Sequence, residues 1–333
     1  MRTAAHGRGR SRRSAVSPVL THVVASSAPW LTFLGSFIAD LTVTAPRLPA
    51  WGESVLGGGF RIGAGGKGSN QAVAAARLGG RACFITRLGR DAFGELARAT
   101  WAREGIDTEF CTDSADHGTG AAAVIVREGA GENAIVVDPG SGMHITVGDI
   151  EAAAYRIAHS AVFVTQLETP LDVVMRALTI ARRAGVTTIL NPAPAAAVPE
   201  ALFALCDYVT PNESEAAALT GLPVRDPAEA EAAARWLMAR GARHVVVTLG
   251  AQGALALSPD GVWHVPAADR GPVVETTGAG DAFNGALAVA LSEGKSLFDA
   301  TRFACVAAGI SVTRAGTSAS MPDRAEVDRA LPA

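Results

Sequence analysis

The sequence predicts an α/β fold: a doubly wound, mostly parallel central sheet flanked by helices, with a small β-strand lid. After residue 145, short apolar runs alternate with longer helical patterns, as in βαβ units. Hydrophobic residues make up 49% of the 333-residue chain, which is enough to build a large core. Two separated segments, about 41–62 and 119–138, contain shorter runs and turn residues, so we expect them to build the lid together.

The part of the chain before residue 145 is expected to supply strands to both the sheet and the lid. Pro46, Pro49 and the run Gly57–Gly59 favour short, exposed strands over central ones in the first lid segment. Apolar runs at 121–126 and 134–137, joined by a glycine-containing turn, predict a hairpin in the second. The other elements expected here are strands over 31–35 and 82–88 and helices over 68–78 and 92–103.

The part after residue 145 is expected to carry most of the parallel sheet. The strands expected here cover 161–165, 186–190, 207–210 and 244–248, and the helices cover 148–158, 171–184, 213–220 and 227–240. Apolar stretches at 253–257 and 262–265 flank the turn Ser258-Pro-Asp-Gly261, which predicts an antiparallel hairpin at the sheet edge. Two apolar helices, over 279–291 and 297–313, follow.

The domain organisation follows from this order of elements. Residues 29–333 are expected to form one α/β domain that carries the lid insertions. An appendage that returns twice to the same place is suited to cover a site. Residues 1–28 are rich in Arg, Ser and Ala and lack periodicity, so we expect a disordered tail or a mis-assigned start. A transit peptide is compatible with this composition, whereas a twin-arginine export signal is only weakly supported.

The composition excludes several classes of protein. Five of the 29 basic residues precede the first acidic residue, Asp40, so the rest of the chain carries 24 basic and 32 acidic side chains. Such an acidic body is not expected to have nucleic acid as its partner. No apolar run approaches the length of a membrane span. The four cysteines show neither CxxC nor zinc-site spacing and are interpreted as reduced thiols, which indicates a cytoplasmic protein.

The first of two glycine-rich loops covers residues 63–70 and contains Lys67, one of only two lysines in the chain. It precedes a predicted helix, so its backbone N–H groups could surround an anion. The loop is not a Walker A sequence but matches GxGxxG at Gly63, Gly65 and Gly68. The alternatives are a tight turn for close helix packing and a dinucleotide site, for which the glycine-broken run before the loop is a poor first strand.

The second loop, Glu275-Thr-Thr-Gly-Ala-Gly-Asp281, also opens a predicted helix. Gly278 and Gly280 free the backbone to surround an anion, and Asp281 falls in the first helical turn beside it. An acid there is badly placed to bind phosphate and well placed to take a proton from a hydroxyl that attacks one. A purely structural, helix-capping role for Asp281 is the alternative.

A third motif, Thr210-Pro-Asn-Glu-Ser-Glu215, follows a predicted strand and begins a helix. It therefore lies at the edge of the sheet where open α/β sheets bind ligands. Asn212 and Glu215 can share a helix face, and oxygen ligands at that spacing suit a hydrated Mg²⁺. An ordinary helix cap is the alternative.

Together these elements resemble the PfkB-type carbohydrate kinases, and within that family the ribokinases, over about residues 31–325. The signatures that carry the resemblance are Gly-Gly-Lys-Gly-Ser-Asn-Gln at 65–71 and Thr-Thr-Gly-Ala-Gly-Asp at 276–281, with further similar stretches at 166–168, 190–195, 210–215 and 248–253. The resemblance implies a ribokinase-like fold and an ATP-dependent kinase that phosphorylates a primary hydroxyl of a pentose, D-ribose above all, to give D-ribose 5-phosphate.

The resemblance also implies a role for each matching residue. Asp281 would be the base that deprotonates the sugar hydroxyl, and the backbone of Gly278, Ala279 and Gly280 would help to form the anion hole for the phosphoryl group. The residues implied to contact the sugar are Asp40, Gly66, Lys67, Asn70, Glu168 and Asp281. The first loop is thereby assigned to the substrate, although its backbone alone suggests a phosphate loop.

Further positions are implied for the nucleotide and the ions. Asn212 and Glu215 would position Mg²⁺ and the phosphates indirectly. The residues implied to lie along the nucleotide are Asn212, Thr248, Gly250, Gly253 and Cys305, and those implied for a monovalent cation, K⁺, are Glu275, Thr277, Ala315, Gly316 and Ser320. A homodimer through the lid is expected, because the short lid strands have open edges that must be covered.

Three positions depart from the ribokinase pattern. Ile38 stands where Asn is usual, and an apolar side chain cannot hydrogen-bond a sugar hydroxyl. This departure raises 2-deoxyribose or another pentose as the substrate. Glu275 stands where Asp is commoner, which bears on K⁺ dependence, and Cys305 stands where His often lies near the adenine.

Other functions remain open on the sequence. A deoxyribokinase, a nucleoside kinase or another PfkB-type sugar kinase would share the second loop. A non-catalytic sugar or nucleotide sensor on the same scaffold would be expected to have lost Asp281 or its flanking glycines, which are intact. An NAD-dependent oxidoreductase is suggested by the GxGxxG match alone.

Overall fold

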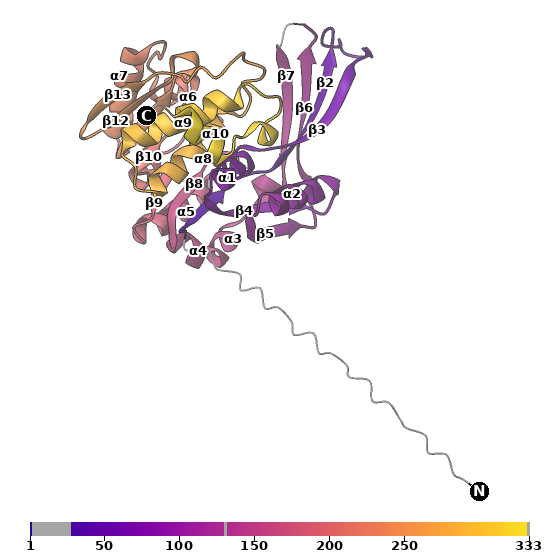
Figure 1. Cartoon of the computed structure of the whole chain (residues 1–333), viewed down its shortest axis with the longest axis horizontal. Coiled ribbons are helices and arrows are strands. Elements are labelled where there is room, and N and C mark those ends of the chain that lie inside the picture. Colours follow the sequence, from indigo (N-terminus) through magenta and orange to yellow (C-terminus); the bar gives the residue numbers. More distant parts are fainter. Residues whose placement is uncertain (2–27, 130–131, 332–333) are drawn as a thin grey trace.

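The computed structural model describes residue 1 and residues 28–129 and 132–331, so the predicted tail lies almost wholly outside the described residues. The described chain forms a nine-stranded sheet between two layers of helices, and a four-stranded sheet stands to one side of this body (Figure 1). We call the two sheets the main sheet and the small sheet. The predicted doubly wound α/β fold is confirmed.

The main sheet has the strand order β13-β12-β11-β10-β9-β8-β1-β4-β5. All pairs from β11 to β5 are parallel, and β12 and β13 form an antiparallel hairpin at one edge, as predicted. The strands are β1 (Trp30–Leu34), β4 (Arg81–Gly89), β5 (Asp107–Ser114), β8 (Ser160–Thr165), β9 (Thr187–Leu190), β10 (Tyr208–Val209), β11 (His244–Thr248), β12 (Ala254–Ser258) and β13 (Gly261–Val265).

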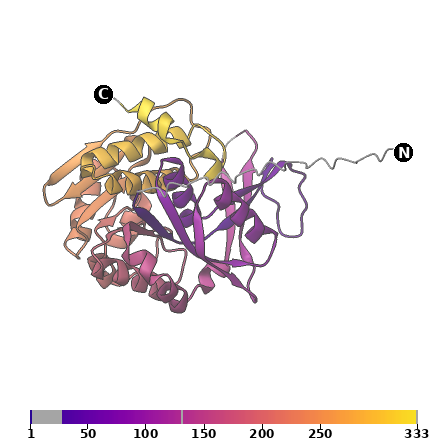
Figure 2. The ribbon, with the colours of Figure 1, turned by 60° about the horizontal axis from the view of Figure 1, so that its bottom comes forward.

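Helices cover both faces of the main sheet (Figure 2). Side chains alternate along each buried strand, so that Phe33 faces one core and Leu34 the other. The helices on the Phe33 face are α1 (Lys67–Arg77), α2 (Ala92–Arg103), α8 (Ala279–Ser292), α9 (Leu297–Ser311) and α10 (Arg324–Ala330). Those on the Leu34 face are α3 (Val147–Ala152), α4 (Ala154–Ala158), α5 (Leu171–Arg183), α6 (Glu213–Thr220) and α7 (Pro227–Met238).

The small sheet joins the two segments that were expected to form a lid. Its strands are β2 (Ile38–Ala45), β3 (Gly58–Gly65), β6 (Thr119–Arg127) and β7 (Asn133–Gly140), in the order β3-β2-β6-β7. Segments distant in sequence meet because β2 pairs with β6 in parallel, from Ile38 opposite Gly120 to Ala45 opposite Arg127. Each pairs on its other side with its own hairpin partner.

Some predicted elements were wrong. The helix expected over 148–158 is two short helices, because Ala153 ends α3 with its N–H shared between the carbonyls of Asp149 and Ile150. The strand β2 is central in the small sheet, since Pro46, Pro49 and Gly57 fall in the connection to β3 and Gly58 and Gly59 begin the edge strand β3. No strand was expected at β5, a polar edge strand, and no helix at α10, in which only Val327 is buried.

A close approach between β1 and α1 brings the first glycine loop to the edge of the main sheet. A Cβ atom on Gly68 would lie 2.7 Å from the Cα atom of Gly35, so neither position accepts a side chain without movement. The expected tight turn for close helix packing is therefore present in this loop.

Among the helices that the structure describes, none combines the length and the apolar character needed to cross a bilayer.

Candidate active site

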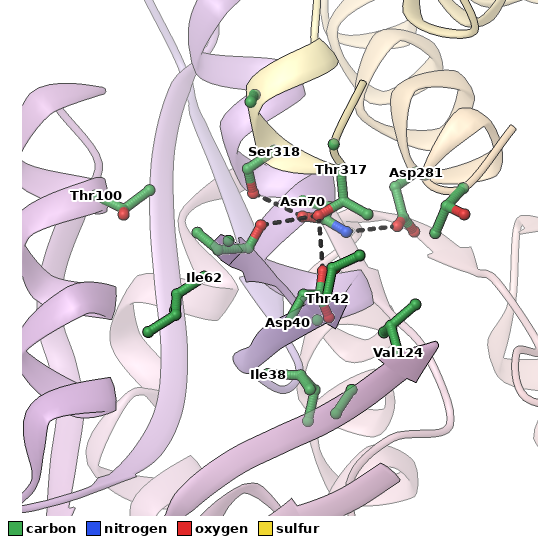
Figure 3. Close-up of a pocket in the computed structure, with 18 of the residues that line it drawn as sticks. Ile38, Asp40, Thr42, Ile62, Asn70, Thr100, Val124, Asp281, Thr317 and Ser318 are labelled. Atoms are coloured by element: carbon green, nitrogen blue, oxygen red, sulfur yellow. Dashed lines mark hydrogen bonds between the residues drawn. The ribbon is translucent and has the colours of Figure 1, made fainter. Parts of the chain in front are cut away.

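A cavity of about 550 Å³ lies between the small sheet and the N-terminal ends of α1 and α8 (Figure 3). Strands of the small sheet form one wall, and the segment 315–319 contributes to another. The structure gathers in this cavity all of the residues implied to contact a sugar, namely Asp40, Gly66, Lys67, Asn70, Glu168 and Asp281. These residues come from segments that are far apart in the sequence.

Asp281 lies in the first turn of α8 and is only 7% exposed. Asn70 Nδ2 donates to its Oδ2 atom at 2.9 Å, and Gln71 Nε2 donates to its Oδ1 atom at 3.0 Å. Burial raises the pKa of Asp281, while the positive charge of Lys67 and the two amide donors act against this. This carboxylate stands in the first helical turn, as expected, but makes no helix-capping hydrogen bond, and its partners are side chains of α1. A carboxylate with a raised pKa in a cavity is suited to accept a proton.

The N-terminus of α8 offers backbone N–H groups beside this carboxylate. Gly278 has a φ of 86°, which favours glycine, and no side chain caps the helix. Within the described residues, the N–H groups of Gly278 and Gly280 donate to no acceptor. A Cβ atom on Gly280 would meet nothing within 4 Å, so no other part of the described chain packs against this side of the residue. Unpaired amides at the positive end of a helix form an anion site.

The N-terminus of α1 is different, although it also follows a glycine-rich loop. The N–H group of Lys67 donates to Glu168 Oε2 at 3.0 Å, and the hydroxyl of Ser36 donates to the same oxygen. The protein's own carboxylate therefore occupies the place where an anion would bind. This contact argues against the phosphate and dinucleotide interpretations of the loop, and Gly63 and Gly65 lie in an edge strand of the small sheet.

Lys67 is the central cation of the site. Burial lowers the pKa of Lys67, but the attraction of nearby carboxylates outweighs it and raises the pKa. Those carboxylates are Asp281, Glu168 and Glu215. Burial in turn raises the pKa of Glu168, and Lys67 opposes this shift. One ammonium group thus stabilises acidic groups from three different elements of the fold.

Asp40 lies on β2 and points toward Thr317, whose hydroxyl is 3.1 Å from its Oδ2 atom (Figure 3). Burial, together with the negative charges of Glu275, Glu168 and Asp281, raises the pKa of Asp40 to about 6, although Thr317 acts against the shift. A Cβ atom on Gly65 would lie 2.3 Å from the same oxygen, so a side chain on the facing strand would displace the Asp40 carboxylate from this position. Asp40 is thus held against the cavity with an unusually basic carboxylate.

The residues implied to bind the nucleotide do not line this cavity. Asn212 and Thr248 lie together through a parallel β-bridge. Gly253 has a φ of 91°, and a Cβ atom there would lie 2.0 Å from the carbonyl oxygen of Val265, so the turn requires glycine. Gly250 also has a positive φ, of 50°. Cys305 is buried in α9, and burial raises its pKa to about 12.

Asn212 and Glu215 form a capping box at the start of α6. Asn212 Oδ1 accepts from the N–H of Glu215 at 2.8 Å, and Glu215 Oε2 accepts from the N–H of Asn212 at 2.9 Å. The second carboxylate oxygen of Glu215 makes no hydrogen bond within the described residues. Within that part of the chain, no group of three or more His, Cys, Asp or Glu side chains could hold a metal ion. Mg²⁺ usually keeps its waters and uses one or two carboxylates plus phosphates, so this arrangement fits it.

Four of the five residues implied for a monovalent cation line the cavity. Those that line the cavity are Glu275, Thr277, Ala315 and Gly316. Glu275 Oε2 accepts from the N–H of Gly316 at 2.8 Å and lies 3.5 Å from a guanidinium nitrogen of Arg61 on β3. Ser320 lies outside the cavity lining, and its hydroxyl donates to the carbonyl of Thr317 at 2.8 Å. A cation at Glu275 would therefore share this carboxylate with Arg61.

Sequence reasoning missed three residues of the site. Gln71 contacts Asp281, Ser318 donates to Asn70 Oδ1 at 2.6 Å, and Thr317 contacts Asp40. Gln71 stands in the first signature beside Asn70, so its place in that run was an available signal. Nothing in the local sequence marks Thr317 or Ser318, because their contacts lie more than 240 residues away along the chain.

Comparison with known proteins places this geometry in a family. Residues 30–324 match the model of the pfkB family carbohydrate kinases. The chain belongs to this family. A ribokinase of Haemophilus influenzae is 41% identical over 296 residues, which cover 89% of this chain and 96% of the relative. A deoxyribokinase of Salmonella typhi is 35% identical over 293 residues, with 88% and 95% covered.

A solved structure extends the comparison. The structure of Arabidopsis thaliana ribokinase complexed with ribose and ATP superimposes with a TM-score of 0.85 at 32% identity. The match covers 91% of this chain and 98% of that one. The main and small sheets thus have the arrangement of a ribokinase-like fold.

The carboxylate of Asp40 makes stability depend on pH. Its pKa is raised to about 6 in the folded chain, against about 3.9 for an unfolded Asp. The folded state therefore binds the proton more tightly, so this group lowers stability as pH rises from about 4 to 6. We expect Asp40→Asn to gain on the order of 1 kcal/mol over the parent protein between pH 5 and pH 8. Denaturant unfolding at both pH values measures this.

The exposed turn residue Asp260 provides the matched control. Asp260→Asn should leave the difference between pH 5 and pH 8 unchanged. An Asp40→Asn protein with the same pH dependence as the parent would contradict the assigned environment of Asp40.

Proposed function

We propose that this protein is an ATP-dependent sugar kinase that phosphorylates the primary hydroxyl of a pentose, converting D-ribose to D-ribose 5-phosphate. The single observation that carries the proposal is a buried carboxylate, Asp281, beside the unpaired N–H groups of Gly278 and Gly280. A base next to an anion site is what transfer of a phosphoryl group to a hydroxyl requires. The ribokinase names of the relatives, and the ribose and ATP in the Arabidopsis complex, support the substrate class.

The reaction needs one proton transfer and one displacement. Asp281 takes the proton of the primary hydroxyl, the hydroxyl oxygen forms a bond to the γ-phosphorus, and the bond from that phosphorus to the bridging oxygen of ADP breaks. The raised pKa of Asp281 makes it a better proton acceptor than an exposed carboxylate. The N–H groups of Gly278 and Gly280 stabilise the negative charge of the transferring group. The N–H group of Ala279 donates to the carbonyl of Thr276 at 3.2 Å and would have to leave it to contribute.

The sugar lies between the small sheet and α1 in this proposal. Asp40 and Glu168 accept hydrogen bonds from its hydroxyls, and Gly66, Lys67 and Asn70 contact it from the α1 side. Glu168 has one oxygen already fixed by Lys67 N–H and Ser36, which leaves its other oxygen for the substrate. Carboxylate oxygens that gain a further hydrogen bond only when a sugar binds discriminate against ligands that lack the matching hydroxyl.

The nucleotide is proposed to lie along Thr248, Gly250 and Gly253 and to approach α9 near Cys305. The close contact of Asn212 with Thr248 supports one continuous surface for it. Glu215, with Asn212, would hold Mg²⁺ through water, and this ion would neutralise charge on the phosphates of ATP. A potassium ion is proposed beside Glu275, with Thr277, Ala315, Gly316 and Ser320 nearby.

The small sheet is proposed to act as a lid that excludes water from the reaction, and as the interface of a homodimer. Within the described residues, β3 and β7 are its open edges. Several apolar side chains on these strands are exposed, among them Phe60, Ile62 and Val136. Open edges with exposed apolar residues favour association with a second chain.

A cytoplasmic location is proposed too, supported by four cysteines that form no disulfide.

Replacement of the proposed base tests the function directly. Asp281→Asn should reduce ribose-dependent ADP release from ATP and Mg²⁺ by on the order of a hundredfold to ten-thousandfold, because an amide cannot accept the proton. Asp172→Asn, a change to a first-turn acid of α5 remote from the cavity, is the matched control and should be fully active. A parent protein that turns over no sugar, or an Asp281→Asn protein with normal turnover, would overturn the proposal.

A second substrate, 2-deoxyribose, is favoured by one observation. Ile38 lines the cavity and is 5% exposed, so the wall offers an apolar surface where a hydroxyl could otherwise be bound. A deoxyribokinase is also among the relatives. If Ile38 sets the preference, Ile38→Asn should raise the ratio of kcat/KM for ribose to that for 2-deoxyribose by about tenfold to a hundredfold.

The same change elsewhere on the cavity wall provides a control for Ile38. Ile62 lines the cavity from β3, apart from Ile38 on β2 (Figure 3), so Ile62→Asn should leave the ratio unchanged. An unchanged ratio in Ile38→Asn would remove Ile38 as the determinant of specificity.

The dimer can be tested at the exposed edge of the small sheet. Val136 on β7 is 75% exposed. If a second copy covers it, Val136→Lys should convert a dimer to a monomer in sedimentation velocity, because a charge would be buried without a partner. Val273, exposed outside the small sheet, supplies the control Val273→Lys. A parent protein that sediments as a monomer at all concentrations would contradict the proposed dimer.

A further inference from the structure

Gln71 lies directly behind the proposed base. It follows Asn70 in α1, is 0% exposed and does not line the cavity. Its Nε2 atom donates to Asp281 Oδ1 at 3.0 Å and to Asn191 Oδ1 at 3.1 Å. Its Oε1 atom accepts from Gln166 Nε2 at 2.6 Å. The NH₂ group and the oxygen of the Gln71 amide are therefore both hydrogen-bonded to other side chains of the protein.

The direction of these hydrogen bonds is fixed at both ends. An ionised carboxylate can only accept, so Gln71 must present its NH₂ group to Asp281 and its oxygen to Gln166. At the other end, Asn191 Nδ2 donates to the carbonyl of Thr210 at 2.9 Å, which also can only accept. Reversal of either amide would set an oxygen against an oxygen. The network thus holds one orientation of Gln71.

This orientation of Gln71 leaves one polar atom of Gln166 buried without a hydrogen bond within the described residues. Its Nε2 atom serves Gln71, and its Oε1 atom is buried without any hydrogen bond in the described residues. Gly35 and Gly68 leave room for that oxygen, since a Cβ atom on Gly35 would lie 2.3 Å from it. A buried unsatisfied oxygen is destabilising, so the arrangement is not explained by stability alone.

A second branch of the network reaches the anion site. The hydroxyl of Thr210 donates to Asn284 Oδ1 at 2.6 Å, and Asn284 Nδ2 donates to the carbonyl of Gly280 at 2.8 Å. Asn191 joins the two branches, because it accepts from Gln71 and donates to Thr210. The carboxylate of Asp281 and the backbone of Gly280 are thereby held by one set of buried amides.

We propose that Gln71 is a positioning residue for phosphoryl transfer: it fixes Asp281 Oδ1 from behind and leaves Oδ2, on the cavity side with Asn70, to take the proton from the substrate hydroxyl. This inference rests on the proposed kinase function. Asn70 lines the cavity and can exchange its contact with Asp281 for one with substrate, whereas Gln71 has no access to the cavity and keeps its contact throughout the reaction.

Removal of the amide should affect the base and not substrate binding. Gln71→Met keeps a similar length and removes the donor to Asp281. We expect kcat to fall by about tenfold or more, with KM for ribose changed less than about twofold, since Gln71 does not touch the sugar. Loss of a donor to the ionised form also raises the pKa of Asp281, so the acidic limb of the kcat–pH profile should move to higher pH.

Ser69 supplies the matched control on the same helix. It is fully buried, and its hydroxyl accepts from Trp101 Nε1 at 2.9 Å, away from Asp281. Ser69→Ala should lower thermal stability while leaving the acidic limb where it is in the parent. A Gln71→Met protein whose limb does not move, or whose kcat falls no more than that of Ser69→Ala, would overturn the role of Gln71.

A second variant and the activity of the parent protein distinguish failure of the role of Gln71 from failure of the proposed kinase function. If Gln71→Met does not fold, Gln166→Met removes the support one step away, and a smaller shift of the limb in the same direction is expected; an unmoved limb there also counts against the proposal. If the parent protein shows no phosphoryl transfer, the proposed function has failed. If the parent is active and only the pH profile is unaffected, the function stands and the role of Gln71 has failed.

Discussion

The hydrogen bond from the backbone N–H of Lys67 to Glu168 distinguishes the two glycine-rich loops, one proposed to contact the sugar and the other the phosphate. Both loops are rich in glycine and both open a helix, so both helices would attract an anion. A fixed carboxylate at α1 satisfies that helix and repels phosphate. At α8 the N–H groups of Gly278 and Gly280 stay unpaired within the described residues. The phosphate site is therefore expected at α8, and α1 is left to contact the sugar.

The same contact organises the charges of the cavity. Glu168 draws Lys67 into a partly buried place, where its ammonium group also stabilises Asp281 and Glu215. Burial still raises the pKa of each of these acids, which leaves them ready to accept protons or hydrogen bonds. The second lysine of the chain, Lys295, does not line the cavity and lies 3.5 Å from Glu293. Lys67 thus connects the proposed base with the acids around it, and Arg61 adds a second positive charge beside Glu275.

The sequence predicted most of the parallel sheet and both glycine loops, because buried strands and helix starts have local patterns. The edge strand β5 escaped prediction, since its polar residues look like a loop. The glycine-rich sequence before α1 suggested a phosphate-binding loop. The contact that argues against this comes from Glu168, which is 101 residues away from Lys67 along the chain. The capping box at Asn212 and Glu215 agrees with the simple alternative and still leaves one oxygen for a hydrated ion. Contacts such as that of Gln71 with Asp281, 210 residues apart, have no local signal.

The most direct test of this account is a crystal structure with ribose and a non-hydrolysable ATP analogue. We expect the γ-phosphate on the N–H groups of Gly278 and Gly280, with the primary hydroxyl of ribose within hydrogen-bond distance of Asp281 Oδ2. Glu168 should remain on the N–H group of Lys67. A phosphate bound at the N-terminus of α1, with Glu168 displaced, would contradict the division of the two loops.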